Sequence, residues 1–341
     1  MPSRYGRPGQ TSDILPSLLA ESGRLSAFVP PFQFTSFFSP EDTLLGMMAG
    51  EAALAHARLP GAHRMPGANQ LRIAELTSGS GLIGFHLLRI ERNSSLMGLD
   101  IDPSARAVAS ANAERLGLSR RARFIRADMW SSNTENLLRR ERPQLLVCNP
   151  PYIPEPPDGR IAVEAGAGPD GTAHLMRTLA LARTIRPRAM ALSWCSLSDP
   201  ESVVLEAERN GYTLNSLFIA VIADGEYSGS VEGYLRTLPR AFLNSAPETL
   251  TAVAPDGSAT FGYLLMSADF SRSEQGPKRK DSKASDQVRI ICSRFARRGI
   301  ASVTALEASF PVRVWLLDRW DEMRLRAFLH GSIPRTALRP E

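Results

Sequence analysis

The residues best suited to chemistry in this chain form a short run, Asn-Pro-Pro-Tyr, at positions 149–152, directly after four apolar residues. The two prolines fix the loop and remove its own N–H donors, which leaves the Asn149 side-chain oxygen and the Pro150 carbonyl oxygen as preset acceptors. Two acceptors fit the two hydrogens of one NH2 group, and the ring of Tyr152 can lie against a planar group. The run therefore predicts a site that holds an amide or a ring amine and directs its nitrogen lone pair. The alternative is a proline-rich turn that merely ends a strand.

A turn that contains two glycines forms a second candidate site. Residues 71–76, Leu-Arg-Ile-Ala-Glu-Leu, are mostly apolar and have the pattern of a strand; they lead into Thr77-Ser78-Gly79-Ser80-Gly81 and then into an apolar helical stretch. Gly79 and Gly81 let the backbone approach a ligand closely, and the helix N-terminus behind them favours negative charge. Such a turn is typical of nucleotide sites, although tight strand-to-helix turns also use glycine for steric reasons alone.

Acidic residues follow the next two strand-like runs. Asp100 ends the second run, where a carboxylate can accept hydrogen bonds from both ribose hydroxyls of a nucleotide. Asp102 stands before a proline and is expected to cap a helix that runs to about residue 116. Asp128 follows the third run and can accept from an adenine amino group, while Met129 or Trp130 covers the ring. A packing role is the alternative for Met129 and Trp130.

A parallel sheet would bring these residues to one edge. Short apolar runs alternate with amphipathic stretches, a pattern typical of a sheet covered by helices on both faces. We therefore predict an α/β fold with a mostly parallel seven-stranded sheet. The expected strands are residues 71–76, 95–99, 123–126, 145–148, 189–193, 214–222 and 262–267.

These motifs together resemble the class I S-adenosylmethionine-dependent methyltransferases, and among them the HemK/PrmC-type protein-glutamine N-methyltransferases. The resemblance covers residues 71–270 and rests on the glycine loop, the run Asn-Pro-Pro-Tyr-Ile-Pro at 149–154 and the turn Gly-Pro-Asp-Gly at 168–171. It implies a Rossmann-like fold and methyl transfer from S-adenosylmethionine to a planar nitrogen. In the cofactor site, the resemblance implies that Glu75 and Gly79 bind the methionine part, Asp100 the ribose and Asp128 the adenine. It implies that Asn149, Pro150 and Tyr152 bind the substrate nitrogen, with Asn149 bordering both ligands. Further implied cofactor contacts are Thr77, Gly81, Ile101 and Met129.

Two departures from the family pattern leave the methyl acceptor open. Thr77 stands where the family has glycine, which predicts a less open turn, and the helical substrate domain of the family is not evident in residues 1–70. The acceptor is then a glutamine amide of a protein or a nitrogen of a small molecule. One alternative is a nucleic-acid methyltransferase that acts on an exocyclic base amine. Another is a non-catalytic cofactor-binding protein. A nicotinamide-dependent redox enzyme is disfavoured, because Asn-Pro-Pro-Tyr has no role in hydride transfer.

The regions on either side of this core differ in composition. Residues 1–70 are expected to form an arm rich in Phe and Pro, with a helix to about residue 57; its phenylalanines either pack on the main domain or form a lid over a substrate. Residues 271–286 are polar and predict a linker. The expected C-terminal appendage, residues 287–341, has strand-like runs at 288–291 and 312–317 and a helix at 321–330.

Charge and composition limit the partners and the compartment. The chain of 341 residues carries a net charge of +5, and residues 271–341 hold 15 basic and 8 acidic side chains, so the excess positive charge lies in this tail. The tail could contact nucleic acid, although an exposed arginine-rich face is the plainer interpretation. No apolar stretch predicts a membrane contact or a secretion signal, so we expect a cytoplasmic protein. The three cysteines and five histidines have no metal-ligand spacing, and the sequence sets no oligomeric state.

Overall fold

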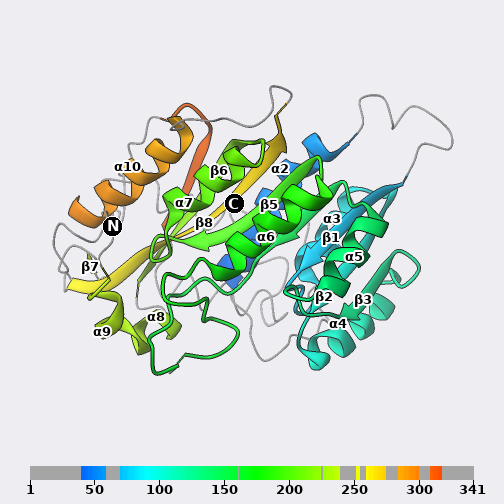
Figure 1. The fold of residues 1–341 in the computed structure, drawn as a ribbon, viewed down its shortest axis with the longest axis horizontal. Coiled ribbons are helices and arrows are strands. Elements are labelled where there is room, and N and C mark those ends of the chain that lie inside the picture. The colour runs from blue at the N-terminus through cyan, green and yellow to red at the C-terminus, as the bar shows by residue number, and fades with distance from the viewer. Residues whose placement is uncertain are drawn as a thin grey trace, which may run out of the picture.

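The chain forms a twisted sheet with helices on both of its faces (Figure 1). This computed structural model describes residues 40–58, 70–159, 161–223, 226–238, 251–253, 259–273, 283–298 and 308–316. The strands are β1 Leu71–Leu76, β2 Ser94–Asp100, β3 Ala122–Arg126, β4 Leu145–Cys148, β5 Ala189–Cys195, β6 Tyr212–Ala223, β7 Thr251–Val253, β8 Ala259–Arg272 and β9 Val312–Leu316. The helices are α2 Pro40–Ala57, α3 Leu82–Ile90, α4 Pro103–Arg115, α5 Ser132–Glu141, α6 Ala173–Ile185, α7 Pro200–Arg209, α8 Glu226–Ser230, α9 Glu232–Leu235 and α10 Lys283–Arg298.

The sheet has the order β3-β2-β1-β4-β5-β8-β6-β9, and β7 pairs with β8. The pairs from β3 to β5 are parallel, and β8 runs against both of its neighbours in the path. The predicted fold class, a mostly parallel α/β sheet, is therefore confirmed. All seven strands predicted for the main sheet form, β9 corresponds to the run expected at 312–317, and β7 is an addition among the described residues.

The chain reverses its direction of travel across the sheet between β1 and β4. It winds outward from β1 to β3 and returns through α5 to β4, which pairs with β1 in parallel. In parallel open sheets, ligands bind at the carboxyl ends of the strands that flank such a reversal. The glycine turn after β1 and the Asn-Pro-Pro-Tyr loop after β4 are thus neighbours.

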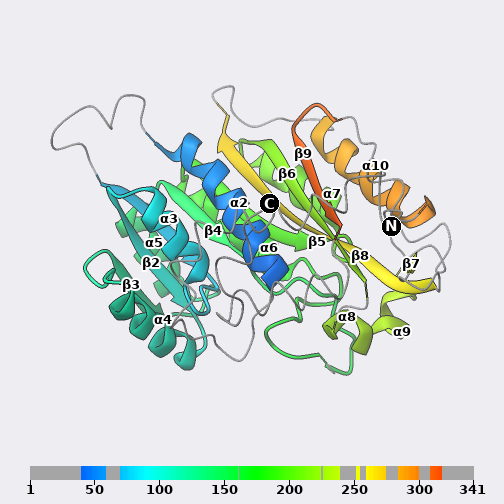
Figure 2. The same cartoon turned by 180° about the vertical axis from the view of Figure 1, so that it is seen from behind.

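The core lies on both faces of the central strands. Every residue of β4 and β5 is buried, which is typical of parallel strands covered on two sides. Helices α2 and α3 pack together on one face, and α5, α6 and α7 cover the other, with α10 packed against α7 (Figures 1 and 2). Among the described residues, the helices lack the combination of length and apolar character that crossing a bilayer requires.

The helix predicted up to about residue 57 is α2, and it lies on the main sheet. Its residues Leu44, Leu45 and Met47 are almost fully buried, and it contacts β5 and β8. Helix α2 is therefore part of the core of the molecule. The phenylalanine cluster at residues 28–38 lies outside the described residues.

The C-terminal region differs from the prediction in two ways. Residues 288–291 were expected to form a strand but lie in α10, because Val288, Ile291, Cys292 and Phe295 repeat at helical spacing and are buried on α7. The expected strand at 312–317 forms as β9, which pairs with β6 and so extends the main sheet. The polar segment predicted at 271–286 is shorter than expected, since β8 continues to Arg272 and α10 begins at Lys283. The helix expected at 321–330 lies outside the described residues.

Candidate active site

The glycine turn after β1 has a backbone that few residue types can adopt. Thr77, Gly79 and Gly81 all have positive φ, at 51°, 48° and 81°. A Cβ on Gly81 would lie 2.8 Å from the Phe85 ring and 2.9 Å from the Phe124 ring. Gly81 therefore satisfies a conformational and a steric requirement together. Thr77 adopts the left-handed conformation although its side chain is β-branched. It is the residue that stands where the family pattern has glycine.

The two requirements at Gly81 can be separated by substitution. We expect Gly81→Ala to lower the free energy of unfolding by about 2–5 kcal/mol, because backbone strain and overpacking add. Gly117 is the matched control, since it has φ 67° and nothing within 4 Å of an added Cβ. Gly117→Ala should cost only the strain, about 1–2 kcal/mol. Equal losses in urea denaturation of the two variants would contradict a close-packed turn.

Asp100 closes the glycine turn from the end of β2. Its Oδ2 accepts from the Gly79 N–H at 2.8 Å and its Oδ1 from the Asp102 N–H at 2.9 Å. Burial raises the pKa of Asp100, and these backbone hydrogen bonds oppose the rise. Asp102 accepts from the Ser104 N–H at 2.7 Å, so its predicted role as the cap of α4 is confirmed. The ribose contact predicted for Asp100 stays a prediction, and each of its oxygens keeps a further lone pair for a ligand.

Glu75 lies beneath the turn, near the end of β1. It is 3% exposed, and its Oε2 accepts from the Gly84 N–H at 3.2 Å. Burial raises the pKa of Glu75 to about 8, and the nearby Asp100 adds to the rise. A buried carboxylate that lacks a cation in the free protein favours a positively charged ligand group, because the opposite charge would restore the ionised form.

The adenine side of the predicted site has exposed apolar side chains. Ile101 is 58% exposed and Trp130 is 53% exposed, whereas Met129 is buried. The Asp128 carboxylate accepts from the Trp130 N–H at 2.9 Å, which fixes the start of this loop. An apolar pair beside an acceptor is the environment that a purine ring with an amino group requires, so these residues fit the predicted cofactor.

Asn149 begins the Asn-Pro-Pro-Tyr loop directly after β4. Its Oδ1 is shielded from water and has no hydrogen-bond partner among the described residues. Leaving a buried acceptor unpaired costs about 1–3 kcal/mol, and a ligand that donates a hydrogen bond to Oδ1 would remove this cost. The Asn149 carbonyl oxygen accepts from the Thr77 hydroxyl at 3.1 Å, so the loop after β4 is bonded to the glycine turn after β1. The neighbouring Pro150 is buried.

Tyr152 is held by a helix rather than left open to a ligand. Its hydroxyl donates to the Asp42 carboxylate in the first turn of α2, and the side chain is 8% exposed. Burial, followed by the charge of Asp42, raises the pKa of Tyr152 well above its usual value. The predicted contact of Tyr152 with a planar substrate stays a prediction. The observed contact indicates that Tyr152 fixes the loop that carries Asn149.

The Tyr152 hydrogen bond should contribute measurably to stability. We expect Tyr152→Phe to lower the free energy of unfolding by about 1–3 kcal/mol, because the buried Asp42 carboxylate loses a donor. Tyr234 donates to the Pro169 carbonyl oxygen at 3.1 Å in an exposed setting. The control Tyr234→Phe should therefore change the stability by less than about 0.5 kcal/mol. Similar thermal unfolding midpoints for Tyr152→Phe and the unmodified chain would contradict the anchoring role.

Two residues near the site were not selected from the sequence. Asp42 lies in the first turn of α2, and its partner Tyr152 is 110 positions away. His174, on α6, has its ring 6.0 Å from the Trp130 ring, and burial lowers its pKa. Asp42 could be identified only by knowing which helix covers the loop that carries Tyr152. The position of His174 just after the Gly-Pro-Asp-Gly turn was a usable signal.

The described part of the chain holds no cluster of three or more His, Cys, Asp or Glu side chains that could bind a metal ion. The candidate site is instead a set of hydrogen-bond acceptors, apolar surfaces and a left-handed turn.

Curated relatives match part of this chain. No protein-family model matches it. A release factor glutamine methyltransferase of Rhodospirillum rubrum is 42% identical over 83 residues, which cover 24% of this chain and 24% of the relative. One from Chlorobaculum tepidum is 35% identical over 121 residues, 35% of this chain and 40% of the relative. A tRNA1(Val) (adenine(37)-N6)-methyltransferase of Porphyromonas gingivalis is 30% identical over 113 residues, 33% of this chain and 40% of the relative.

The chain thus spans less than half the length of these relatives. Two of the three share their name with the family that the motifs at residues 75–81 and 149–154 indicated. The resemblance to glutamine N-methyltransferases predicted from those motifs is therefore confirmed by similarity to enzymes of that name.

Proposed function

We propose that this chain is an S-adenosylmethionine-dependent methyltransferase that acts on a planar nitrogen. One observation carries the proposal: the buried Oδ1 of Asn149, which has no hydrogen-bond partner among the described residues, lies in a loop bonded through Thr77 to the glycine turn. An acceptor oxygen that the chain itself does not use, fixed beside a nucleotide-type turn, is what an external N–H group requires. The similarity to enzymes that methylate amide and adenine nitrogens supports the same reaction.

The residues at the carboxyl edge divide the cofactor among them. Asp100 would take the ribose hydroxyls, Ile101 and Met129 would contact the adenine, and Asp128 would accept from its amino group. Gly79, Gly81 and Thr77 form the turn that would hold the methionine part, and Glu75 would bind its amino group. When bound, S-adenosylmethionine supplies a methyl group on a positively charged sulfur, which is already a good electrophile.

The chain aligns the acceptor nitrogen. Asn149 Oδ1 and the Pro150 carbonyl oxygen accept the two N–H bonds, so the nitrogen lone pair points along the line of attack. A bond forms between nitrogen and the methyl carbon, the carbon–sulfur bond breaks with its electron pair kept on sulfur, and one N–H proton leaves to solvent. No strong base is needed in this scheme, and rate comes from alignment.

The favoured acceptor is the side-chain amide of a glutamine in a protein, as the names of two relatives indicate. The alternative is an exocyclic adenine amine of RNA, which presents the same NH2 geometry and has support from the tRNA-modifying relative. For either acceptor, we propose that the reaction takes place in the cytoplasm. The basic tail would favour the RNA acceptor by contacting its phosphates.

An acceptor panel distinguishes these functions. The chain is incubated with S-adenosylmethionine carrying a labelled methyl group and, in separate reactions, with a purified bacterial release factor and with unmodified tRNA. We expect label on one glutamine of the release factor, located by mass spectrometry of its peptides. Label on tRNA alone would make the nucleic-acid alternative the function. Cofactor binding without transfer to either acceptor, or to protein and RNA of a cell extract, would contradict the proposal.

A further inference from the structure

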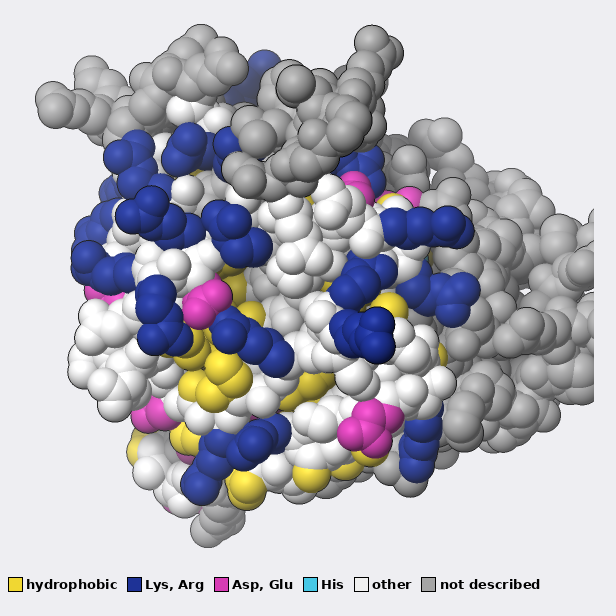
Figure 3. All heavy atoms as spheres, turned by 90° about the vertical axis from the view of Figure 1, so that its right-hand side faces the viewer, with side chains coloured by type: hydrophobic (Ala, Val, Ile, Leu, Met, Phe, Trp, Pro, Cys, Tyr) yellow, Lys and Arg dark blue, Asp and Glu magenta, His cyan; other side chains and the backbone are white. Residues whose placement is uncertain are grey.

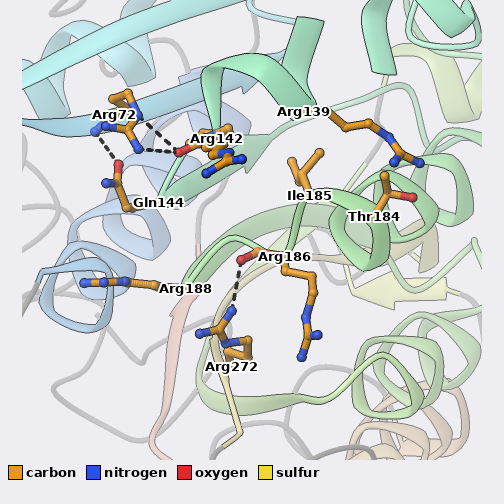
Figure 4. A pocket seen from close by; sticks show the side chains of 10 residues that line it. Arg72, Arg139, Arg142, Gln144, Thr184, Ile185, Arg186, Arg188 and Arg272 are labelled. Carbon is orange, nitrogen blue, oxygen red and sulfur yellow. Dashed lines mark hydrogen bonds between the residues drawn. The ribbon is translucent and has the colours of Figure 1, made fainter. Parts of the chain in front are cut away.

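A cavity lined by arginines lies at the edge of the sheet opposite the candidate active site. Its volume is about 420 Å³. The residues that line it sit at the start of β1, at the ends of α5 and α6, before β4 and β5, and at the end of β8 (Figure 4). The six arginines are Arg72, Arg139, Arg142, Arg186, Arg188 and Arg272, and the described residues that line the cavity include no Asp or Glu.

Some of these arginines have partners within the fold. Arg72 donates through Nε to the Glu141 carbonyl oxygen at 2.7 Å, and Arg139 forms an ion pair with Glu135 at 2.8 Å. Arg272 donates to the Arg186 carbonyl oxygen at 3.3 Å. The contacts of Arg72 and Arg272 satisfy carbonyl groups at helix ends, where positive side chains are favourable, and the contact of Arg139 neutralises a carboxylate. They explain three of the six arginines.

The other three have no such explanation. Arg142, Arg186 and Arg188 have no carboxylate partner among the described residues. Arg142 and Arg186 each occupy the position after a helix with positive φ, 48° and 52°, where glycine or asparagine is usual. Two helices thus end with an arginine in a conformation that disfavours it, and both arginines line the same cavity. Like charges gathered in this way repel one another unless a negative group lies between them.

Figure 3 views the molecule from the side on which β1 begins, and Lys and Arg side chains there far outnumber Asp and Glu side chains. The active-site loops follow Leu76 and Cys148, at the opposite ends of β1 and β4. The arginine cavity is therefore separate from the site where methyl transfer is proposed.

We propose that this cavity binds a compact polyphosphate, such as the triphosphate group of a nucleotide. Guanidinium groups bind phosphate oxygens in pairs of parallel hydrogen bonds, and several arginines around one cavity match several phosphates in a row. The volume falls in the range of small-molecule sites, and Pro143 and Ile185 add an apolar wall that could contact a base. Free nucleotides and the 5′ end of an RNA chain both present this chemistry.

The test measures binding of inorganic triphosphate to the full chain by calorimetry at 50 and 200 mM salt. We expect a Kd below about 100 µM at the lower salt and weaker binding at the higher salt. The double variant Arg186→Gln/Arg188→Gln should bind at least about tenfold more weakly, because two charged contacts are removed. The control Arg120→Gln/Arg183→Gln removes the same charge from exposed positions that do not line the cavity and should bind within about twofold of the unmodified chain.

Further probes identify the source of the phosphates and exclude unfolding. ATP that binds as tightly as triphosphate would indicate a free nucleotide, whereas a short RNA with a 5′ triphosphate that binds more tightly would indicate an RNA end. Both variants should keep the thermal unfolding midpoint of the unmodified chain. The proposal is overturned if triphosphate fails to bind at 50 mM salt, if both double variants lose affinity equally, or if an RNA without a terminal phosphate binds while triphosphate does not. These binding measurements do not depend on methyl transfer, so a failure of this proposal can be distinguished from a failure of the proposed function.

Discussion

Asn149→Ala should lower kcat for methyl transfer by about 10²–10³-fold. The substitution removes one of the two acceptors that hold the substrate nitrogen, and loss of a single aligned hydrogen-bonding group at a reacting centre has this order of effect. Because Oδ1 has no partner among the described residues, its removal should cost the fold little. The affinity for S-adenosylmethionine, measured by calorimetry, should change by less than about threefold.

The conservative variant separates chemistry from structure. Asn149→Asp keeps an acceptor oxygen at the position of Oδ1 and replaces the side-chain NH2 by a second oxygen, so it should retain more of the activity than Asn149→Ala. If Asn149→Ala binds the cofactor but is inactive while the unmodified chain is active, this result also excludes a purely non-catalytic binding role. Activity of Asn149→Ala within about tenfold of the unmodified enzyme would contradict the proposed grip on the nitrogen.

The affinity for the cofactor should depend on pH because Glu75 titrates. Burial raises the pKa of Glu75 to about 8, so in the free protein this carboxyl is protonated below that pH. A cationic cofactor favours the ionised form, and binding must then release the proton. The Kd for S-adenosylmethionine should therefore rise, by up to about tenfold per pH unit, as the pH falls from 7.5 to 5.5.

Two glutamine variants test whether Glu75 is the source. Glu75→Gln should bind the cofactor weakly and with little dependence on pH, because the titrating group is gone. Glu208→Gln removes another buried glutamate, which lies in the last turn of α7, and should keep the pH dependence of the unmodified chain. A steep pH dependence that persists in Glu75→Gln would assign the effect to another group.

The same pKa shift affects the stability of the free chain. Between the ordinary pKa of 4.5 and about 8, the folded chain keeps a proton on Glu75 that the unfolded chain releases. The contribution of Glu75 to the free energy of unfolding therefore falls as the pH rises through this range. Cofactor should reduce this loss, since it stabilises the ionised carboxylate.

The sequence predicted the site-bearing half of the fold well, for a physical reason. Strands β1 and β4 are mostly buried, so apolar residues dominate both, although Arg72 and Glu75 interrupt the run in β1, and glycine or proline marks the turns that follow them. The predicted bounds of both strands match the structure. Residues 288–291 show the limit of such patterns, because four residues with two isoleucines and a valine resemble a strand until the helical repeat to Phe295 is included.

Contacts between distant segments could not be predicted in this way. The bond between Tyr152 and Asp42 depends on where α2 lies on the sheet, and no local pattern specifies that position. The bond from the Thr77 hydroxyl to the Asn149 carbonyl likewise depends on β1 and β4 being neighbours. Local chemistry identified the residues, whereas the order of the strands determined which of them meet.

The most direct measurement is a crystal structure of the chain with S-adenosylhomocysteine and a peptide that carries the acceptor glutamine. The account predicts that Asn149 Oδ1 and the Pro150 carbonyl oxygen each lie about 2.7–3.2 Å from the amide nitrogen, with that nitrogen facing the cofactor sulfur. An amide nitrogen bound elsewhere, or an Asn149 Oδ1 bonded to the protein's own backbone in that complex, would contradict it.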